Sequence, residues 1–313
     1  MPLDPQAKAF LDQIAAMGGP ALNEVPVEIA RTASDAMAQW AGPGPDVARV
    51  ENRKIPGSNG DIPIRIYTPG TEAGYPVLVF FHGGGWVIGS LESHDAICRT
   101  LANQASCIVV SVDYRLAPEH KFPAAAEDSY TATRWVAAHA ASFAGDPQRI
   151  AVGGDSAGGN LAAVVAQLAQ QRGGPPLVLQ LLVYPATDAN RDTPSYHDNG
   201  DGYLLTRPMM DWFFDHYMTG DSDKADPRLS PLRAASLQGL PPALVITAEF
   251  DPLRDEGERY AERLRQAGVP VQLSRYDGMI HGFFGMSSMI DKAKLAVDEA
   301  ASALRAAFSA KGR

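Results

Sequence analysis

Cysteine is scarce in this chain of 313 residues, which contains only Cys98 and Cys107. Their spacing matches no common metal site, and two cysteines cannot build a disulfide framework. A secretory signal is not expected either, because Asp4, Lys8 and Asp12 interrupt the N-terminal segment. We therefore expect two reduced, partly buried thiols in a cytoplasmic protein.

Long apolar runs and basic clusters are also missing from the sequence. No apolar stretch approaches the roughly 18 residues that a membrane span needs. The net charge is −9, and no run of Lys and Arg is available to neutralise the phosphates of a nucleic acid. The composition of the chain, with 45% hydrophobic and 20% charged residues, is typical of a globular protein with a large core. Nucleic acids and a transmembrane location are thus excluded.

From about residue 60 onward, short β-branched runs alternate with helical patterns. The expected strands cover residues 62–68, 77–81, 107–114, 149–154, 177–184, 243–249 and 271–277. Several runs are apolar on both faces, as parallel strands covered by helices on each side require. The alternation predicts an α/β fold with a mostly parallel central sheet flanked by helices.

Two segments interrupt this alternation. Residues 1–45 form amphipathic helices, with Phe10, Ile14 and Met17 on one face. Residues 188–235 begin with a turn-rich stretch and continue into a dense aromatic helix. We expect both segments to form a helical cap over the carboxyl edge of the sheet, where open α/β sheets bind ligands. The core of the fold then comprises residues 46–187 and 236–313.

The stretch IAVGGDSAGGN surrounds one hydroxyl, that of Ser156, with four glycines directly after an apolar strand. A phosphate-binding loop requires Gly-Lys-Ser/Thr, and a dinucleotide turn requires glycine where Asp155 stands, so neither matches. The G-x-S-x-G pattern from Gly154 to Gly158 does match a nucleophile elbow between a strand and a helix. Glycines two before and two after the serine remove Cβ atoms that would collide across the turn.

A serine nucleophile needs a histidine base, which a carboxylate orients. Where a nucleophile elbow is used, the chain order is serine, acid, histidine. His197 and His216 fall in the expected cap, whereas His281 follows the last strand in a glycine-flanked loop, so His281 is the expected base. Asp251 is the first carboxylate after the preceding strand and is the expected acid. The competing carboxylates are Glu249, Asp255 and Asp277, and for Asp255 a position at a helix N-terminus is the favoured explanation.

The stretch FFHGGGWVIGS follows another strand and offers backbone N–H groups for a developing oxyanion. We expect Gly83 and Gly84 to donate together with Ala157, the residue after the nucleophile. A simple tight turn is the alternative for this motif alone. Asp155 is expected to support the loop beneath the site, and an Arg115–Glu119 ion pair is expected to brace the stretch DYRLAPE.

Taken together, these motifs resemble the hormone-sensitive-lipase family of esterases, in its GDSAG bacterial subgroup. The matching blocks occur in family order and span nearly the whole chain: HGGGW at 82–86, DYRLAPEHKFPAA at 113–125, GDSAGGNLA at 154–162, YP at 184–185, DPLRDEG at 251–257 and HGF at 281–283. The resemblance implies the capped α/β-hydrolase fold, the triad Ser156, Asp251 and His281, and the oxyanion donors Gly83, Gly84 and Ala157. Family members are often dimers, so a homodimer is also compatible with it.

The expected activity is hydrolysis of short- to medium-chain acyl esters by a serine carboxylesterase through an acyl-enzyme. The substrates are a small ester and water, and the chemistry uses no cofactor and no metal. Candidate residues for the substrate pocket are Trp86, Met209, Met210, Phe213 and Phe214. An amidase or deacetylase would use the same triad. A non-catalytic binding protein, like the plant gibberellin receptors on this scaffold, would lack the histidine that His281 supplies.

Overall fold

A mixed eight-stranded sheet forms the centre of the molecule in the computed structural model, which describes residues 2–310. Its spatial order is β1 (Arg49–Gly57), β2 (Gly60–Thr68), β4 (Ile108–Val112), β3 (Tyr75–Phe81), β5 (Gly145–Asp155), β6 (Leu179–Val183), β7 (Ala243–Phe250) and β8 (Val271–Ile280). The β1–β2 and β2–β4 pairs are antiparallel, and all other pairs are parallel. This arrangement confirms the α/β-hydrolase fold and the seven expected strands.

One strand, β1, was not predicted from the sequence. It pairs with β2 through a tight hairpin in which Gly57 and Gly60 face each other. Most of its side chains are exposed or half-buried, because it lies at the edge of the sheet, so it lacks the apolar run that marks the inner strands. The Asn59–Gly60 pair at the turn is the signal that could have revealed it.

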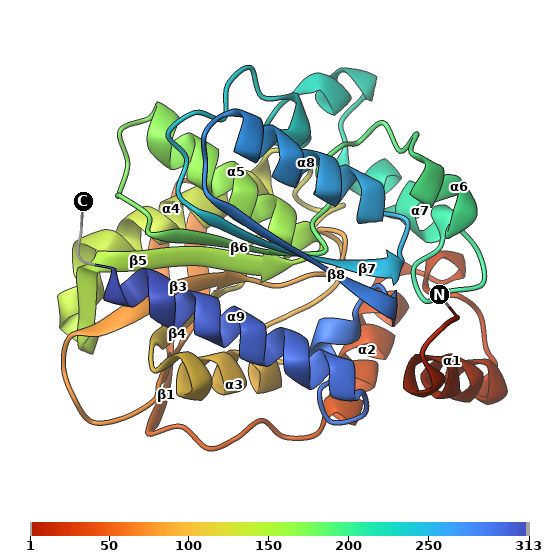
Figure 1. Cartoon of the computed structure of the whole chain (residues 1–313), viewed down its shortest axis with the longest axis horizontal. Helices are drawn as coiled ribbons and strands as arrows, with labels where there is room; N and C mark the ends of the chain where they lie inside the picture. The colour runs from red at the N-terminus through yellow and green to blue at the C-terminus, as the bar shows by residue number, and fades with distance from the viewer. Residues whose placement is uncertain (1, 311–313) are drawn as a thin grey trace.

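Helices cover both faces of the sheet. Helices α3 (Asp95–Ala105) and α9 (Asp291–Ser309) pack together on one face, and α4 (Ala124–His139), α5 (Ala157–Gln171) and α8 (Arg254–Gln266) cover the other (Figure 1). Alternate residues of β3 enter two separate cores: Val77, Val79 and Phe81 face α4 and α5, whereas Leu78 and Phe80 face α3 and α9. This double burial explains why the run VLVFF is continuously apolar.

The two segments that interrupt the alternation lie at one end of the sheet. Helices α1 (Pro5–Met17), α2 (Val27–Ala38), α6 (Pro194–Asp198) and α7 (Arg207–Tyr217) gather where the strand arrows of β5 and β7 point (Figure 1). Short 3-10 helices complete the chain at Leu22–Glu24, Gln39–Ala41, Ala140–Phe143, Asp221–Ala225, Pro231–Arg233 and Phe283–Gly285. Of the expected apolar face of α1, Phe10 is buried but Met17 is 64% exposed.

Both cysteines are free and buried, and burial raises the pKa of Cys107 to about 12. This agrees with the expectation of two reduced thiols. Across residues 2–310, no helix combines the length and the apolar character that crossing a membrane requires.

Candidate active site

Ser156 lies on a sharp turn between the end of β5 and the start of α5. Its backbone has φ 56° and ψ −118°, a strained conformation for a residue with a side chain. A Cβ on Gly154 would lie 2.3 Å from the Phe81 carbonyl oxygen, and one on Gly158 would lie 1.9 Å from the same atom. The two glycines therefore let strand β3 approach the turn closely, and the turn presents Ser156 at the edge of the sheet.

Ser156, His281 and Asp251 form a continuous hydrogen-bonded chain. The Nε2 atom of His281 lies 2.9 Å from Ser156 Oγ, and its Nδ1 atom lies 2.7 Å from Asp251 Oδ2. Asp251 is fully buried, and His281 is 8% exposed. The structure thus brings together the three residues predicted for the triad, although they are up to 125 positions apart in sequence.

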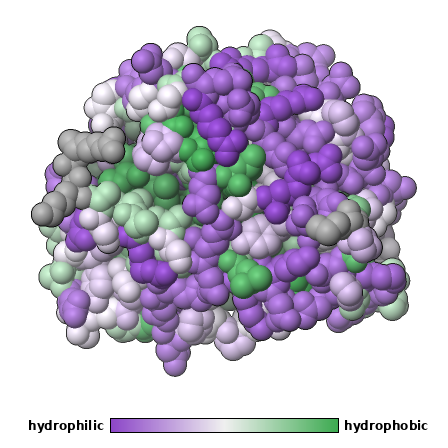
Figure 2. All heavy atoms as spheres, in the orientation of Figure 1, coloured by the Kyte–Doolittle hydropathy of each residue, from purple (hydrophilic) through white to green (hydrophobic). Residues whose placement is uncertain are grey.

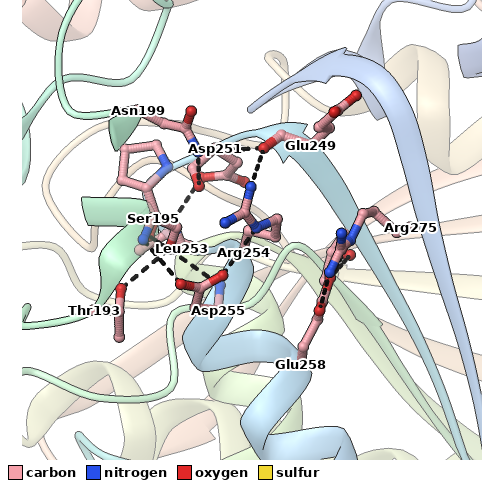
Figure 3. Close-up of polar contacts among 12 residues, drawn as sticks. Thr193, Ser195, Asn199, Glu249, Asp251, Leu253, Arg254, Asp255, Glu258 and Arg275 are labelled. Carbon is pink, nitrogen blue, oxygen red and sulfur yellow. Dashed lines mark hydrogen bonds and ion pairs between the residues drawn. The ribbon is translucent and has the colours of Figure 1, made fainter. Parts of the chain in front are cut away.

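The turn that carries Asp251 is held by a contact of its own and by residues of the 188–235 segment. The Leu253 N–H donates to Asp251 Oδ1 at 2.8 Å, and the side-chain amide of Asn199 donates to the carbonyl oxygens of Glu249 and Asp251. On the other side of the turn, the Ser195 hydroxyl donates to the Pro252 carbonyl oxygen at 2.7 Å (Figure 3). These contacts fix the carboxylate that orients His281.

The competing acids and bases make other contacts. Asp255, in the first turn of α8, accepts a hydrogen bond from the Ser195 N–H at 2.9 Å (Figure 3), and Glu249 accepts one from the Gly278 N–H. The ring of His216 bonds to the Trp212 carbonyl oxygen within α7, and His197 is paired with Asp192. None of these contacts joins Ser156, whose side chain is bonded to His281, or His281, whose ring is bonded to Asp251.

The N–H of Gly83 is not directed as the sequence analysis expected. It donates to Asp155 Oδ1 at 3.0 Å and lies 3.2 Å from His94 Nε2. A Cβ at residue 83 would lie 2.4 Å from Asp155 Oδ2, so glycine is needed here for the approach of this carboxylate. Because the N–H is already bonded within the protein, the structure argues against Gly83 as an oxyanion donor.

The next two glycines are better placed for that role. Gly84 and Gly85 have φ values of +116° and +57°, which favour glycine. Within residues 2–310, no hydrogen bond from either N–H to an acceptor in the chain is found. Ala157 is the first residue of α5, where a backbone N–H has no acceptor in its own helix. These three residues and Ser156 line one cavity.

The expected Arg115–Glu119 ion pair does not form. The Arg115 guanidinium instead makes two hydrogen bonds to the buried carboxylate of Asp128, at 2.7 and 2.8 Å. Glu119 pairs with Arg31 of α2, whose guanidinium also donates to the carbonyl oxygens of Val87 and Ala117. The sequence analysis paired Arg115 with Glu119 because they are close in sequence. Their partners in the structure lie on other elements: Asp128 on α4 and Arg31 on α2 of the N-terminal segment.

An open cavity of about 200 Å³ lies above Ser156. Of the residues predicted for the substrate pocket, Trp86, Met209, Met210 and Phe213 line it, whereas Phe214 does not. Phe214 is buried beside the Trp86 ring, at a centroid distance of 5.4 Å. Consecutive residues of a helix face different directions, so α7 turns Phe213 toward the cavity and Phe214 into the protein interior.

The sequence analysis missed several residues of this cavity. The lining also includes Leu22, Ser34 and Met37 from the N-terminal segment and Leu204 and Leu205 from the loop before α7. No motif marks these positions, and only the expectation that both segments cover the sheet pointed to them. His94 was missed as well, although it lines the same cavity.

In the part of the chain that the structure describes, no group of three or more His, Cys, Asp or Glu side chains is arranged to hold a metal ion. The polar groups that converge on Ser156 are the triad and backbone N–H groups, which suit a nucleophilic substitution at a carbonyl carbon.

Comparison with known proteins places this geometry in a family. Residues 78–285 match the α/β hydrolase fold family. The chain is 50% identical to the carboxylic ester hydrolase LipN of Mycobacterium tuberculosis, over 86% of this chain and 73% of the relative. It is 40% identical to the ethyl acetate hydrolase of Pseudomonas putida, over 94% of this chain and 95% of that relative.

Solved structures agree with these relatives. The hyperthermophilic esterase from the archaeon Pyrobaculum calidifontis superposes with a TM-score of 0.94 at 43% identity, over 98% of this chain and 99% of the other. An ester-hydrolase from the metagenome of Lake Arreo was solved in complex with a bipyridine phosphonate derivative. It superposes with a TM-score of 0.95 at 44% identity, over 98% of this chain and 99% of the other. The chain therefore belongs to the α/β-hydrolase fold family, in its hormone-sensitive-lipase-like branch of carboxylic ester hydrolases.

Proposed function

We propose that this protein is a serine carboxylesterase that hydrolyses short- to medium-chain acyl esters through an acyl-enzyme on Ser156. The observation that carries the proposal is the Ser156–His281–Asp251 chain, with contacts of 2.9 and 2.7 Å, at an apolar cavity open to small esters. Relatives named as a carboxylesterase and an ethyl acetate hydrolase support it.

In the first half of the reaction, His281 Nε2 takes the proton of Ser156 as its oxygen attacks the ester carbonyl carbon. Asp251 stabilises the imidazolium through Nδ1. The N–H groups of Gly84, Gly85 and Ala157 then stabilise the oxyanion. His281 protonates the leaving alcohol, and water repeats the cycle on the acyl-enzyme, which releases the acid and restores Ser156.

The experiment that tests this function compares esters with amides of the same acyl groups. We expect 4-nitrophenyl esters from acetate to palmitate to be cleaved fastest at short or medium chain lengths, and the matching 4-nitroanilides to be cleaved at least about 10² times more slowly, since an amide also needs protonation of its leaving nitrogen. Faster turnover of the anilides would instead identify an amidase. No turnover of either series by folded protein would favour a binding protein.

The acyl-length preference is expected to depend on Phe213. We predict that Phe213→Leu raises turnover of octanoate relative to acetate by about three- to tenfold, because it opens space in the cavity. Phe214→Leu removes the same volume from a side chain that does not line the cavity and should leave the ratio unchanged. The 4-nitrophenyl ester series measures both variants, and equal shifts in the two would contradict this assignment of the pocket.

Acid should inactivate the enzyme through His281. Once Nε2 carries a proton it cannot accept the one from Ser156, so kcat/KM is expected to fall by about tenfold per pH unit on the acid side of the profile. A kcat/KM that stays constant from pH 5 to 8, measured on an ester that is stable over this range, would contradict His281 as the base.

We further propose that the segments 1–45 and 188–235 act together as the cap, since residues of both line the cavity above Ser156. Limited proteolysis within either segment should reduce ester turnover if this is correct.

We also propose a cytoplasmic location, which the two free cysteines support. Fractionation of the source cells tests this location.

A homodimer is also proposed. The strand β8 ends the sheet, and exposed strand edges can pair with another chain. On the face shown in Figure 2 hydrophilic residues predominate, and the largest hydrophobic area lies near the sheet edge around β8. Light scattering of the purified protein tests this proposal, and a monomer mass at micromolar concentration would overturn it.

A further inference from the structure

The proposed oxyanion donors, Gly84 and Gly85, belong to a tight turn in the loop after β3. The Gly84 carbonyl oxygen accepts hydrogen bonds from the N–H groups of Val87 and Ile88, at 3.1 and 2.9 Å. These bonds close the turn on itself, but they do not fix its orientation relative to Ser156. That orientation has to come from contacts with other parts of the chain.

Two hydrogen bonds reach the backbone of this turn from outside it, among those found within residues 2–310. The Ala117 N–H donates to the Trp86 carbonyl oxygen at 2.9 Å, and Arg31 Nε of α2 donates to the Val87 carbonyl oxygen at 2.9 Å. Arg31 Nη2 also donates to the Ala117 carbonyl oxygen at 3.0 Å. Arg31 therefore makes one external bond itself and also binds the residue that makes the other.

The guanidinium of Arg31 uses two of its edges at this position. Nε and Nη2 face the two carbonyl oxygens, and Nη1 and Nη2 each lie 2.8 Å from a carboxylate oxygen of Glu119. Arginine presents its donors in a planar, rigid fork that suits such an arrangement of several acceptors. The hydrogen bonds from Arg31 lower the pKa of Glu119 to about 2, so the pair is charged at neutral pH.

Packing alone does not set the direction of the oxyanion donors. The Trp86 side chain is buried and stacks on the Tyr217 ring at a centroid distance of 4.5 Å, which fixes where the turn lies. Apolar contact is non-directional, whereas a hydrogen bond weakens steeply when its angle is poor. The bonds from Arg31 and Ala117 are therefore the contacts that orient the peptide groups next to Gly85. A displacement of about 1 Å in a positioned group can cost about 10² in rate.

Arg31 does not line the cavity above Ser156, but its helix does, through Ser34 and Met37. Replacing Arg31 can therefore act in two ways. It can change the orientation of the oxyanion-binding turn, or it can shift α2 and change the cavity lining. The first effect acts on the transition state, whereas the second acts on every ligand that fills the cavity.

We propose that Arg31 is a positioning residue for ester hydrolysis, which orients the turn of Gly84 and Gly85 by binding the carbonyl oxygens of Val87 and Ala117. The N-terminal segment then contributes to stabilisation of the oxyanion as well as to the cover of the cavity. The proposal rests on the function proposed above. It goes beyond the triad and the oxyanion donors, because Arg31 acts through the backbone of the turn.

Two variants separate the carbonyl contacts from the ion pair. Arg31→Met keeps a side chain of similar length without donors, whereas Glu119→Gln removes the charge of the partner and leaves the two carbonyl contacts of Arg31. We expect Arg31→Met to lower kcat on 4-nitrophenyl butyrate by about 5- to 30-fold, less than the roughly 10²- to 10³-fold loss of a complete oxyanion donor. Because the Glu119 side chain is 48% exposed, Glu119→Gln should retain kcat within about threefold of the wild type.

A pair of inhibitors separates the turn from the cavity lining. An alkyl trifluoromethyl ketone adds to Ser156 as a hemiketal oxyanion, whereas the corresponding trifluoromethyl alcohol fills the cavity without forming one. In Arg31→Met the Ki of the ketone should rise by the same factor by which kcat/KM falls, and the Ki of the alcohol should change by less than about threefold. All rates and Ki values are measured well below the unfolding temperatures of both variants, so that the protein is folded.

An unchanged kcat in Arg31→Met, or an equal rise in the Ki of the ketone and of the alcohol, would overturn the proposal. Equal losses of kcat in Arg31→Met and Glu119→Gln would also overturn it, because the ion pair would then carry the effect. If the wild type hydrolyses the ester and Arg31→Met does so equally fast, only the role of Arg31 is wrong. If the wild type turns over no ester, the esterase proposal fails, and the role of Arg31 fails with it.

Discussion

Replacing Ser156 with alanine is expected to lower kcat on 4-nitrophenyl butyrate by about 10⁴ to 10⁶. The hydroxyl is the atom 2.9 Å from His281 Nε2, and no covalent acyl-enzyme can form without it. Residual turnover would come from the oxyanion-binding N–H groups and from substrate binding, which do not depend on the side chain. KM should change little, because all other residues that line the cavity are the same.

The loss in Ser156→Ala must occur in a folded protein to be informative. Alanine at φ 56° is strained as serine is, so the thermal unfolding temperature should stay within a few degrees of the wild type. Steady-state rates on protein purified away from contaminating esterases provide the measurement. Activity of the alanine variant within tenfold of the wild type would show that another residue is the nucleophile.

Replacing Asp251 with asparagine is expected to lower kcat by about 10⁴ with the fold intact. Asp251 Oδ1 accepts the Leu253 N–H at 2.8 Å, so an asparagine should keep its oxygen there and turn its NH₂ group toward His281 Nδ1. Nδ1 must then accept, which places the ring proton on Nε2 and leaves no lone pair for the proton of Ser156. The variant has the wrong tautomer of the base.

This mechanism for Asp251→Asn can be distinguished from simple loss of the turn. Asp255→Asn changes a carboxylate on the same turn that bonds to Ser195 and should retain kcat within about threefold. Rates of both variants on one ester, together with their unfolding temperatures, measure the difference. Equal losses in the two variants would show that the turn as a whole, and not the carboxylate at residue 251, supports catalysis.

The nucleophile, base and acid could be predicted because local chemistry restricts each of them. Gly154 and Gly158 flank Ser156 where β3 leaves no room for a Cβ, and this steric requirement is visible as a pattern. Asp251 follows the buried strand β7 and His281 follows the edge strand β8. Because these two strands are parallel, the sheet delivers both residues to the same edge. The inner strands were equally clear, since burial on both faces requires a continuous apolar run.

The contacts that could not be predicted depend on the direction of groups rather than on residue type. The HGGG motif indicates that the backbone approaches a neighbouring group closely. The sequence does not show that the Gly83 N–H donates to Asp155, whereas no acceptor is found within residues 2–310 for the N–H groups of Gly84 and Gly85. Arg31 pairs with Glu119 across 88 positions, and no local pattern encodes that choice. Likewise, the alternation along α7 did not reveal which of Phe213 and Phe214 faces the cavity.

The most direct test of the account is covalent labelling of the nucleophile. A 4-nitrophenyl alkylphosphonate should release one equivalent of 4-nitrophenol per protein chain, abolish ester turnover, and add the phosphonyl mass to the peptide that contains Ser156, with no addition in Ser156→Ala. Labelling of a different residue, or full ester turnover by protein that the phosphonate does not modify, would contradict a mechanism in which Ser156 attacks the substrate.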